Sequence, residues 1–212
     1  MLIQPANRKM MIWLLITSLF LLAFVIILVF VTGNTSPDEE AFTVIAPYIS
    51  EDRTVFMQNI SFLSNHRFLI PANLFFIAYL LSRKDKWGAF TAALVALSSL
   101  GLMSLLKNLI GRHRPANSLV QGITNFGFPS GHALMGVAFY GLLIWWIMDN
   151  IKDKWQKRIM ISFLLFLLFL IGFSRVYLRV HYPTDVIAGY CIGTAWLISC
   201  LWLMDKVRRR KN

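Results

Sequence analysis

The sequence predicts an all-α membrane protein with six transmembrane helices, both termini in the cytoplasm, and short amphipathic helices in the first outer loop. Two observations support this fold class. Hydrophobic residues make up 57% of the 212-residue chain, which is too many for an ordinary soluble domain. They also gather into six separate segments, several of which approach the ~20 residues that a helix needs to cross a bilayer. We expect residues 1–212 to form one membrane-embedded domain.

The first apolar segment is long enough to cross a bilayer alone and too long for the core of a signal peptide. The second, fourth and fifth segments are shorter, so we expect their helices to extend into polar flanks that line a protein cavity. In the last segment, Gly189-x-x-x-Gly193 predicts close packing against another helix of the bundle. The predicted spans are 10–31, 68–82, 87–106, 131–148, 159–173 and 185–204.

Residues 32–67, between the first two spans, are predicted to form short helices on the outer side. Ser36 followed by Pro37 is typical of a helix start, and Ser50 can begin a second helix. Apolar residues of the second helix fall largely on one face, which favours an amphipathic helix at the membrane interface. Two roles stay open for this loop: it covers or guides lipid toward a site on the outer side, or it only packs.

The basic residues indicate an orientation and argue against nucleic acid as a partner. The formal net charge is +11, but it is concentrated on one side of the six-span arrangement. By the positive-inside rule that side is cytoplasmic, which places both termini inside. Fourteen of the 21 lysines and arginines lie there, at residues 8–9, 83–86, 152–158 and 206–211.

Three short patterns lie on the opposite, outer side, each at the edge of an apolar segment. Together they supply three cations, two imidazoles, one carboxylate and a glycine at a helix start. These groups suit the binding of a phosphate and its transfer to a histidine. The patterns are Lys107-x6-Arg114-Pro115, Pro129-Ser130-Gly131-His132 and Ser174-Arg175-x5-His181-x3-Asp185.

The first pattern supplies two phosphate-binding candidates, Lys107 and Arg114. Pro115 disfavours helical geometry at Arg114, and Gly111 weakens the helix between the two cations. We therefore expect Arg114 to turn back toward the site. Either cation, taken alone, would more often extend from its helix to the membrane interface than bind a phosphate.

The other phosphate-binding candidates are Ser130, Gly131 and Arg175. A helix that begins near Ser130 presents free N–H groups and a positive dipole end to an anion. Gly131 lets the backbone approach an oxygen closely. Arg175 can hold phosphate oxygens with its planar fork, which a lysine cannot do.

His181, Asp185 and His132 are the catalytic candidates. Pro183 suits the first position of the last helix, which places Asp185 in its first turn, within reach of one nitrogen of His181. The carboxylate would orient the ring and leave the other nitrogen as a nucleophile. His132 has no carboxylate nearby in the sequence and suits a general acid.

The three patterns resemble the signature of the type 2 phosphatidic acid phosphatase superfamily, over residues 107–185. This resemblance implies that His181 becomes a phosphohistidine, that Asp185 is its partner and that His132 is the acid. It also implies a lipid phosphatase, resembling the bacterial phosphatidylglycerophosphatase B and undecaprenyl-diphosphate phosphatase types, in the bacterial inner membrane with its site facing the periplasm or exterior. The substrate is then undecaprenyl diphosphate, phosphatidylglycerol phosphate, phosphatidic acid or lipid A.

No cofactor or metal ion is expected, because the outer patterns contain one carboxylate and no cluster with ligand spacing. Two alternatives stay open: a phosphotransferase that passes phosphate from the same histidine to another lipid, and a non-enzymatic translocator. The sequence does not indicate an oligomeric state. For the other polar residues near the patterns, including Arg112 and Tyr182, ordinary interfacial roles are favoured over contact with a headgroup.

Overall fold

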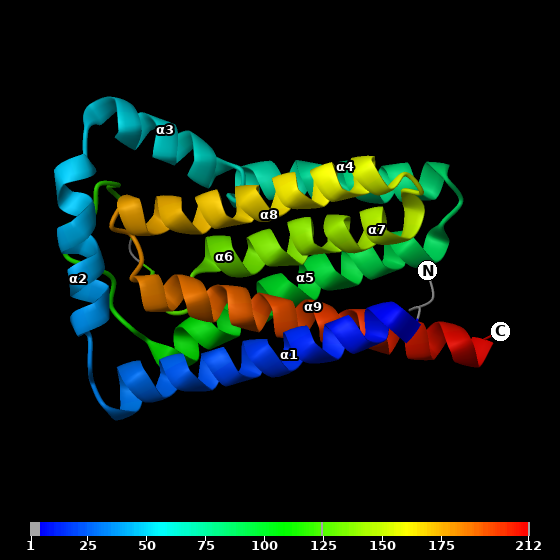
Figure 1. Cartoon of the computed structure of the whole chain (residues 1–212), viewed down its shortest axis with the longest axis horizontal. Coiled ribbons are helices and arrows are strands. Elements are labelled where there is room, and N and C mark those ends of the chain that lie inside the picture. Colours follow the sequence, from blue (N-terminus) through cyan, green and yellow to red (C-terminus); the bar gives the residue numbers. More distant parts are fainter. Residues whose placement is uncertain (1–4, 124, 212) are drawn as a thin grey trace.

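In the computed structural model, which describes residues 5–123 and 125–211, every regular element of those ranges is helical. The long helices run roughly parallel, and the start of α1 lies at the same end of the bundle as the end of α9 (Figure 1). The long helices are α1 (Pro5–Ile26, continued by a π-helical turn over Ile27–Val31), α4 (His66–Ser82), α5 (Lys86–Ile110), α6 (Gly131–Gly136, continued by a π-helical turn over Val137–Gly141 into α7, Leu142–Asn150), α8 (Lys154–Tyr177) and α9 (Pro183–Lys211).

Each predicted span coincides with one of these helices, and five of the helices are long and apolar enough to cross a membrane. The helix over 66–82 has 17 residues, or about 25 Å at 1.5 Å per residue, against a hydrocarbon core of about 30 Å. A crossing by α4, and with it the count of six, stays a prediction. The helix over 154–177 extends the predicted span 159–173 at both ends and so includes Arg175.

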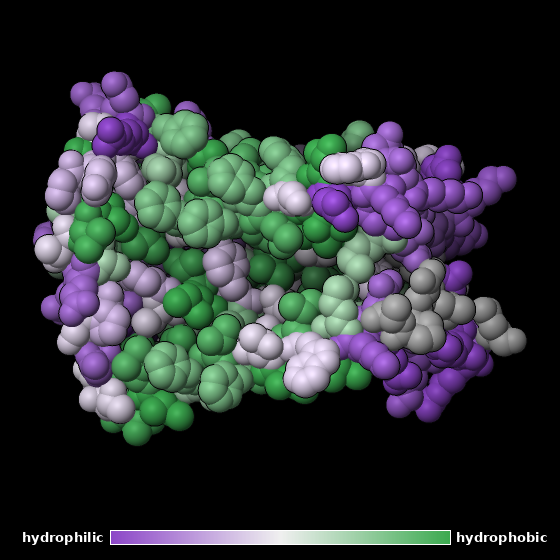
Figure 2. Space-filling view, viewed as in Figure 1, coloured by the Kyte–Doolittle hydropathy of each residue, from purple (hydrophilic) through white to green (hydrophobic). Residues whose placement is uncertain are grey.

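On the face shown in Figure 2, an apolar belt covers the middle of the bundle, and hydrophilic residues gather where α1 begins and α9 ends. Large apolar side chains of the long helices are well exposed, for example Phe20 at 72%, Phe75 at 77% and Phe163 at 62%. A protein in water rarely exposes so much contiguous apolar surface, whereas lipid tails cover it without cost. The surface is therefore that of a helical membrane protein.

Two glycines of α9 allow this helix to lie against α6. A Cβ atom on Gly189 would lie 2.7 Å from the carbonyl oxygen of Ser130, and one on Gly193 would lie 2.9 Å from that of Leu134. Any side chain here would push the helices apart. The predicted close packing within the bundle is confirmed, and it holds the start of α6 against the start of α9.

Residues 32–67 form two short α-helices at the positions that the sequence predicts. Helix α2 (Ser36–Ile45) lies across the end of the bundle, and α3 (Glu51–Phe62) runs back beside α8 (Figure 1). Only part of the apolar arc of α3 is packed: Ile60 contacts the core, while Val55 and Phe56 are about half exposed. In α2, the carboxylate of Asp38 is fully buried, so this helix is anchored to the bundle.

Candidate active site

The three sequence patterns meet at a cavity of about 860 Å³ near the α2 end of the bundle. Its apolar wall comes mainly from α4 and α5, with residues such as Leu74, Leu97 and Leu100, and α3 and the segment 120–125 contribute further residues. The charged side chains therefore lie at one end of the cavity, and the rest of the cavity runs between apolar helices. The pattern residues that line it are Lys107, Arg114, Gly131, His132, Arg175 and His181.

Arg114 reaches the cavity because α5 ends before it. Gly111 follows the last helical residue with φ of 64°, a left-handed conformation that favours glycine, and the chain then turns. One guanidinium nitrogen of Arg114, Nη1, lies 2.5 Å from the carbonyl oxygen of Val180 and 3.1 Å from Nε2 of His181. The other two nitrogens donate to the backbone and side-chain oxygens of Asn125, a residue that the sequence analysis missed.

The other two cations keep donors available for an anion. Lys107 Nζ donates one hydrogen bond, to the carbonyl oxygen of Phe126 at 2.9 Å. Arg175 is 6% exposed and donates through Nη1 to the hydroxyl of Ser61 in α3. Its buried Nε has no hydrogen-bond partner among the described residues. A buried donor without a partner costs free energy, which an anion in the cavity would recover.

The second pattern forms the start of α6. The N–H of Ser130 donates to the carbonyl oxygen of Asp185 at 2.9 Å, and its buried hydroxyl has no partner in the described part of the chain. A Cβ atom on Gly131 would lie 2.6 Å from the sulfur of Met103, so a side chain here would displace the Met103 side chain of α5. The carbonyl oxygen of His132 accepts from the hydroxyl of Ser64, while His132 lines the cavity.

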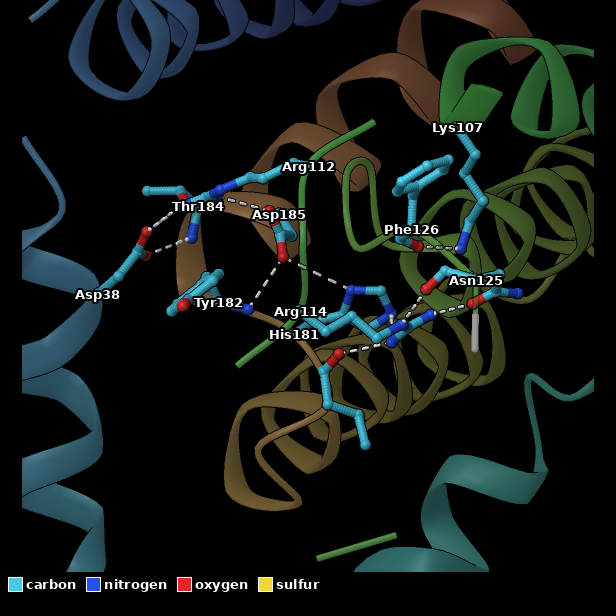
Figure 3. A network of polar contacts seen from close by, with 11 residues as sticks. Asp38, Lys107, Arg112, Arg114, Asn125, Phe126, His181, Tyr182, Thr184 and Asp185 are labelled. Carbon is cyan, nitrogen blue, oxygen red and sulfur yellow. Dashed lines mark hydrogen bonds and ion pairs between the residues drawn. The ribbon is translucent and has the colours of Figure 1, made fainter. Parts of the chain in front are cut away.

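His181 is held between a cation and a carboxylate (Figure 3). A guanidinium can only donate, so Nε2, which contacts Arg114, accepts with its lone pair. The proton is then on Nδ1, which lies 3.6 Å from Oδ2 of Asp185. Burial, together with the charges of Arg114, Arg175 and Lys107, holds the pKa of His181 well below its ordinary value. A lowered pKa favours the uncharged form of the ring.

Asp185 lies in the first turn of α9, as predicted, and is fully buried. Its Oδ2 accepts from the backbone N–H of Tyr182 at 3.0 Å, and its Oδ1 accepts from Nη1 of Arg112 at 2.6 Å. At 3.6 Å, the His181 Nδ1 to Asp185 Oδ2 distance is longer than a hydrogen bond. In this state Arg112 and the backbone hold the carboxylate, and His181 is its neighbour.

Arg112 differs from its predicted interfacial role. Its side chain is only 10% exposed and joins two buried carboxylates, Asp185 and Asp38 of α2. Its guanidinium also lies 4.4 Å from the centre of the Tyr182 ring. No local pattern marks Asp38, which is far from the other site residues in sequence and reaches them only through the placement of α2.

The charges of the cavity suit an anion. Its wall carries Lys107, Arg114 and Arg175 but neither Asp185 nor Asp38. Within the described ranges, no group of three His, Cys, Asp or Glu side chains is arranged to hold a metal ion.

Comparisons with known proteins agree with this chemistry. The sequence profile described as the PAP2 superfamily matches residues 88–209. Phosphatidylglycerophosphatase B of Bacillus subtilis is 26% identical to this chain over 91% of it and 96% of that protein. Lipid A 4'-phosphatase of Bacteroides thetaiotaomicron is 31% identical, over 55% of this chain and 56% of its own length.

Solved structures share the fold. The crystal structure of a transmembrane PAP2-type phosphatidylglycerolphosphate phosphatase from Bacillus subtilis superimposes with a TM-score of 0.78, over 95% of this chain and 97% of that one, at 24% identity. The crystal structure of Aquifex aeolicus LpxE has a TM-score of 0.58, over 79% of this chain and 93% of that one, at 25% identity.

Proposed function

The chain belongs to the PAP2 superfamily and is a membrane lipid phosphatase of that family, and on this premise we propose that it works without a metal ion, through a phosphohistidine on His181. The observation that carries the proposal is the position of His181. Its Nε2 lone pair meets Arg114 at the cavity wall, and its protonated nitrogen faces Asp185. When a phosphate displaces Arg114 from Nε2, its phosphorus lies next to the Nε2 lone pair, which can then attack it.

The first step forms a bond between Nε2 of His181 and phosphorus and breaks the bond from phosphorus to the leaving oxygen. The imidazole becomes positively charged, and Asp185, beside Nδ1, stabilises that charge. Arg114, Arg175 and Lys107 balance the negative charge on the phosphoryl oxygens. The negative charge of the bound phosphate favours a proton on His132, which lies on the same cavity wall, and His132 donates that proton to the leaving oxygen.

The second step is hydrolysis of the phosphohistidine. His132 is left without its proton after the first step, so it can accept one from water as the water oxygen attacks phosphorus. The bond from phosphorus to Nε2 then breaks, and phosphate leaves with His181 neutral again. Transfer to a second lipid would differ only in the acceptor oxygen.

The substrate is a lipid whose phosphate occupies the cationic end of the cavity and whose tails follow the apolar wall of α4 and α5. Among the candidates, phosphatidylglycerol phosphate is favoured, because the similarity to phosphatidylglycerophosphatase B extends over nearly the whole of both chains. Undecaprenyl diphosphate, phosphatidic acid and lipid A carry the same phosphate chemistry and stay in the test.

The orientation is part of the proposal. The basic clusters at residues 8–9 and 206–211 lie on helices whose ends meet at the face opposite α2 (Figure 1). The positive-inside rule then places α2 and the cavity outside a bacterial inner membrane. Reporter proteins fused to the C-terminus would check this: activity of a reporter that works only outside the cytoplasm would contradict it.

The test is phosphate release by the detergent-purified protein, with EDTA present, from each of the four lipids supplied singly. We expect release that resists EDTA and is lost in His181→Ala. The matched control is His113→Ala, an exposed histidine that does not line the cavity. Release that needs a divalent ion, or that survives in His181→Ala, would refute the mechanism. Release that appears only when a second lipid is added would identify a phosphotransferase.

A further inference from the structure

A chain of buried charges joins the outer helix α2 to the catalytic carboxylate (Figure 3). Asp38 of α2 accepts three hydrogen bonds: one from Nη2 of Arg112 at 2.8 Å, one from the backbone N–H of Thr184 at 3.0 Å and one from the Thr184 hydroxyl at 2.7 Å. Arg112 then donates through Nη1 to Asp185 at 2.6 Å and to the Thr184 hydroxyl at 2.8 Å. The network contains one guanidinium and two carboxylates.

The network leaves one negative charge without a cation of its own. If Asp38 were absent, the guanidinium of Arg112 would be paired with Asp185 alone, and their charges would cancel. Asp185 would then stabilise a positive charge on His181 less strongly. Asp38 contacts Nη2 of Arg112 at 2.8 Å, whereas Asp185 contacts Nη1, so Asp38 neutralises part of the guanidinium charge. The carboxylate keeps more of its charge for the imidazole.

We propose that Asp38 is a positioning residue of the phosphatase reaction: it shares Arg112 with Asp185 and so keeps the charge of Asp185 available to His181. The inference rests on the proposed function, because it concerns the step in which His181 becomes positively charged. It gives α2 a part in the chemistry in addition to its place across the end of the bundle.

Asp38 and its partners lie outside the cavity, so a change at Asp38 should affect turnover and not substrate binding. None of Asp38, Arg112 and Thr184 lines the cavity, whereas the cations expected to contact phosphate do. A change at Asp38 therefore acts through Asp185 and not on the bound lipid. We therefore expect kcat to fall and KM to stay close to its wild-type value.

A purely structural role for Asp38 makes a different prediction. Asp38 accepts from the backbone N–H of Thr184 in the first turn of α9, in the manner of a helix cap supplied by another helix. If capping were its whole role, the charge would matter little, and loss of the Thr184 hydroxyl would disturb the same contact. The two roles separate when charge and hydrogen bonds are removed independently.

The experiment measures kcat and KM for phosphate release from phosphatidylglycerol phosphate in detergent, on protein that elutes as a single folded species. Asp38→Asn keeps the shape of the side chain and removes its charge. We expect kcat to fall by about 10-fold to 100-fold, the range found when a partner that orients a metal-binding side chain is removed, with KM within about twofold. The matched control is Glu40→Gln, an exposed carboxylate of the same helix, which we expect to behave as the wild type.

The second variant is the double change Asp38→Asn with Arg112→Gln, which restores the net charge of the wild-type network. We expect its kcat to be higher than that of Asp38→Asn alone, because Asp185 no longer faces an unshared guanidinium. Thr184→Val, which keeps all three charges, is expected to lose much less kcat than Asp38→Asn.

Three results would overturn the inference: an unchanged kcat in Asp38→Asn, a double variant no faster than Asp38→Asn, or a loss in Thr184→Val as large as that in Asp38→Asn. The wild type and His181→Ala run in the same assay. If the wild type released no phosphate from any lipid, the proposed function itself would fail. Release that depends on His181 with no effect of Asp38 would reject this inference alone.

Discussion

Replacing Arg175 with lysine tests whether a planar fork, and not only a positive charge, holds the phosphate. In the structure Nη1 of Arg175 is engaged by Ser61, and its buried Nε has no partner among the described residues. Arg175→Lys keeps one charge and offers a single nitrogen. The variant therefore loses at least one charge-assisted hydrogen bond to the transferring phosphoryl group.

The magnitude follows from that lost bond. A hydrogen bond to a charged group contributes about 1.5–3 kcal/mol, and each 1.4 kcal/mol corresponds to a factor of ten. We therefore expect kcat/KM to fall by about 10-fold to 100-fold. The overall charge of the cavity is unchanged, so a general loss of anion attraction is not the cause.

The assay is phosphate release over a range of lipid concentrations, with the melting temperature in detergent as a check on folding. The matched control is Arg67→Lys, an exposed arginine of α4 that does not line the cavity, which we expect to be indistinguishable from the wild type. If Arg175→Lys stayed within about twofold of the wild type while both proteins were folded, the reasoning from fork geometry would be refuted.

Two further predictions concern electrostatics and packing. The charge of Arg114 helps to lower the pKa of His181, so Arg114→Gln should raise that pKa toward its ordinary value, and the ring should protonate at higher pH than in the wild type. Nuclear magnetic resonance of histidine-labelled, lipid-free protein, with the signal assigned by His181→Ala, measures this; an unmoved or lower pKa would contradict it. A Cβ atom on Gly189 would lie 2.7 Å from the Ser130 carbonyl oxygen, so Gly189→Ala should destabilise the protein by about 1–3 kcal/mol and lower its melting temperature. Gly101→Ala, where a Cβ atom meets nothing within 4 Å, is the control and should not lower it.

The course of the long helices could be read from the sequence because hydropathy acts locally. Each apolar segment is recognisable alone, and the predicted spans differ from the helices mainly at their ends. The span 159–173 became α8 over 154–177: its C-terminal flank carries Arg175 to the cavity, whereas its N-terminal flank, residues 154–158, is largely exposed. The close contact at Gly189 could also be predicted, since small residues spaced four apart act on one helix face.

The candidate site could be predicted only as a set of residues, and the tertiary structure decided which of them act on one another. His181 and Asp185 are close in sequence, so their pairing could be expected, yet the structure places Arg112 in hydrogen-bond contact with Asp185 and leaves His181 at 3.6 Å. Arg112 was assigned to the interface because its partners, Asp38 and Asp185, come from distant helices.

The sequence by itself determined that the chain is helical, that its apolar segments suit a bilayer, and which three patterns hold the cations, histidines and carboxylate of the candidate site. The tertiary structure alone decided that Asp38 of α2 reaches Thr184, that Ser61 of α3 holds Arg175, and that α4 and α5 form the apolar wall of the cavity. The physical reason is that the free energy of placing a segment in the bilayer depends on the amino-acid composition of that segment alone. Pairing between buried charges depends instead on which helices become neighbours and how each is rotated about its axis.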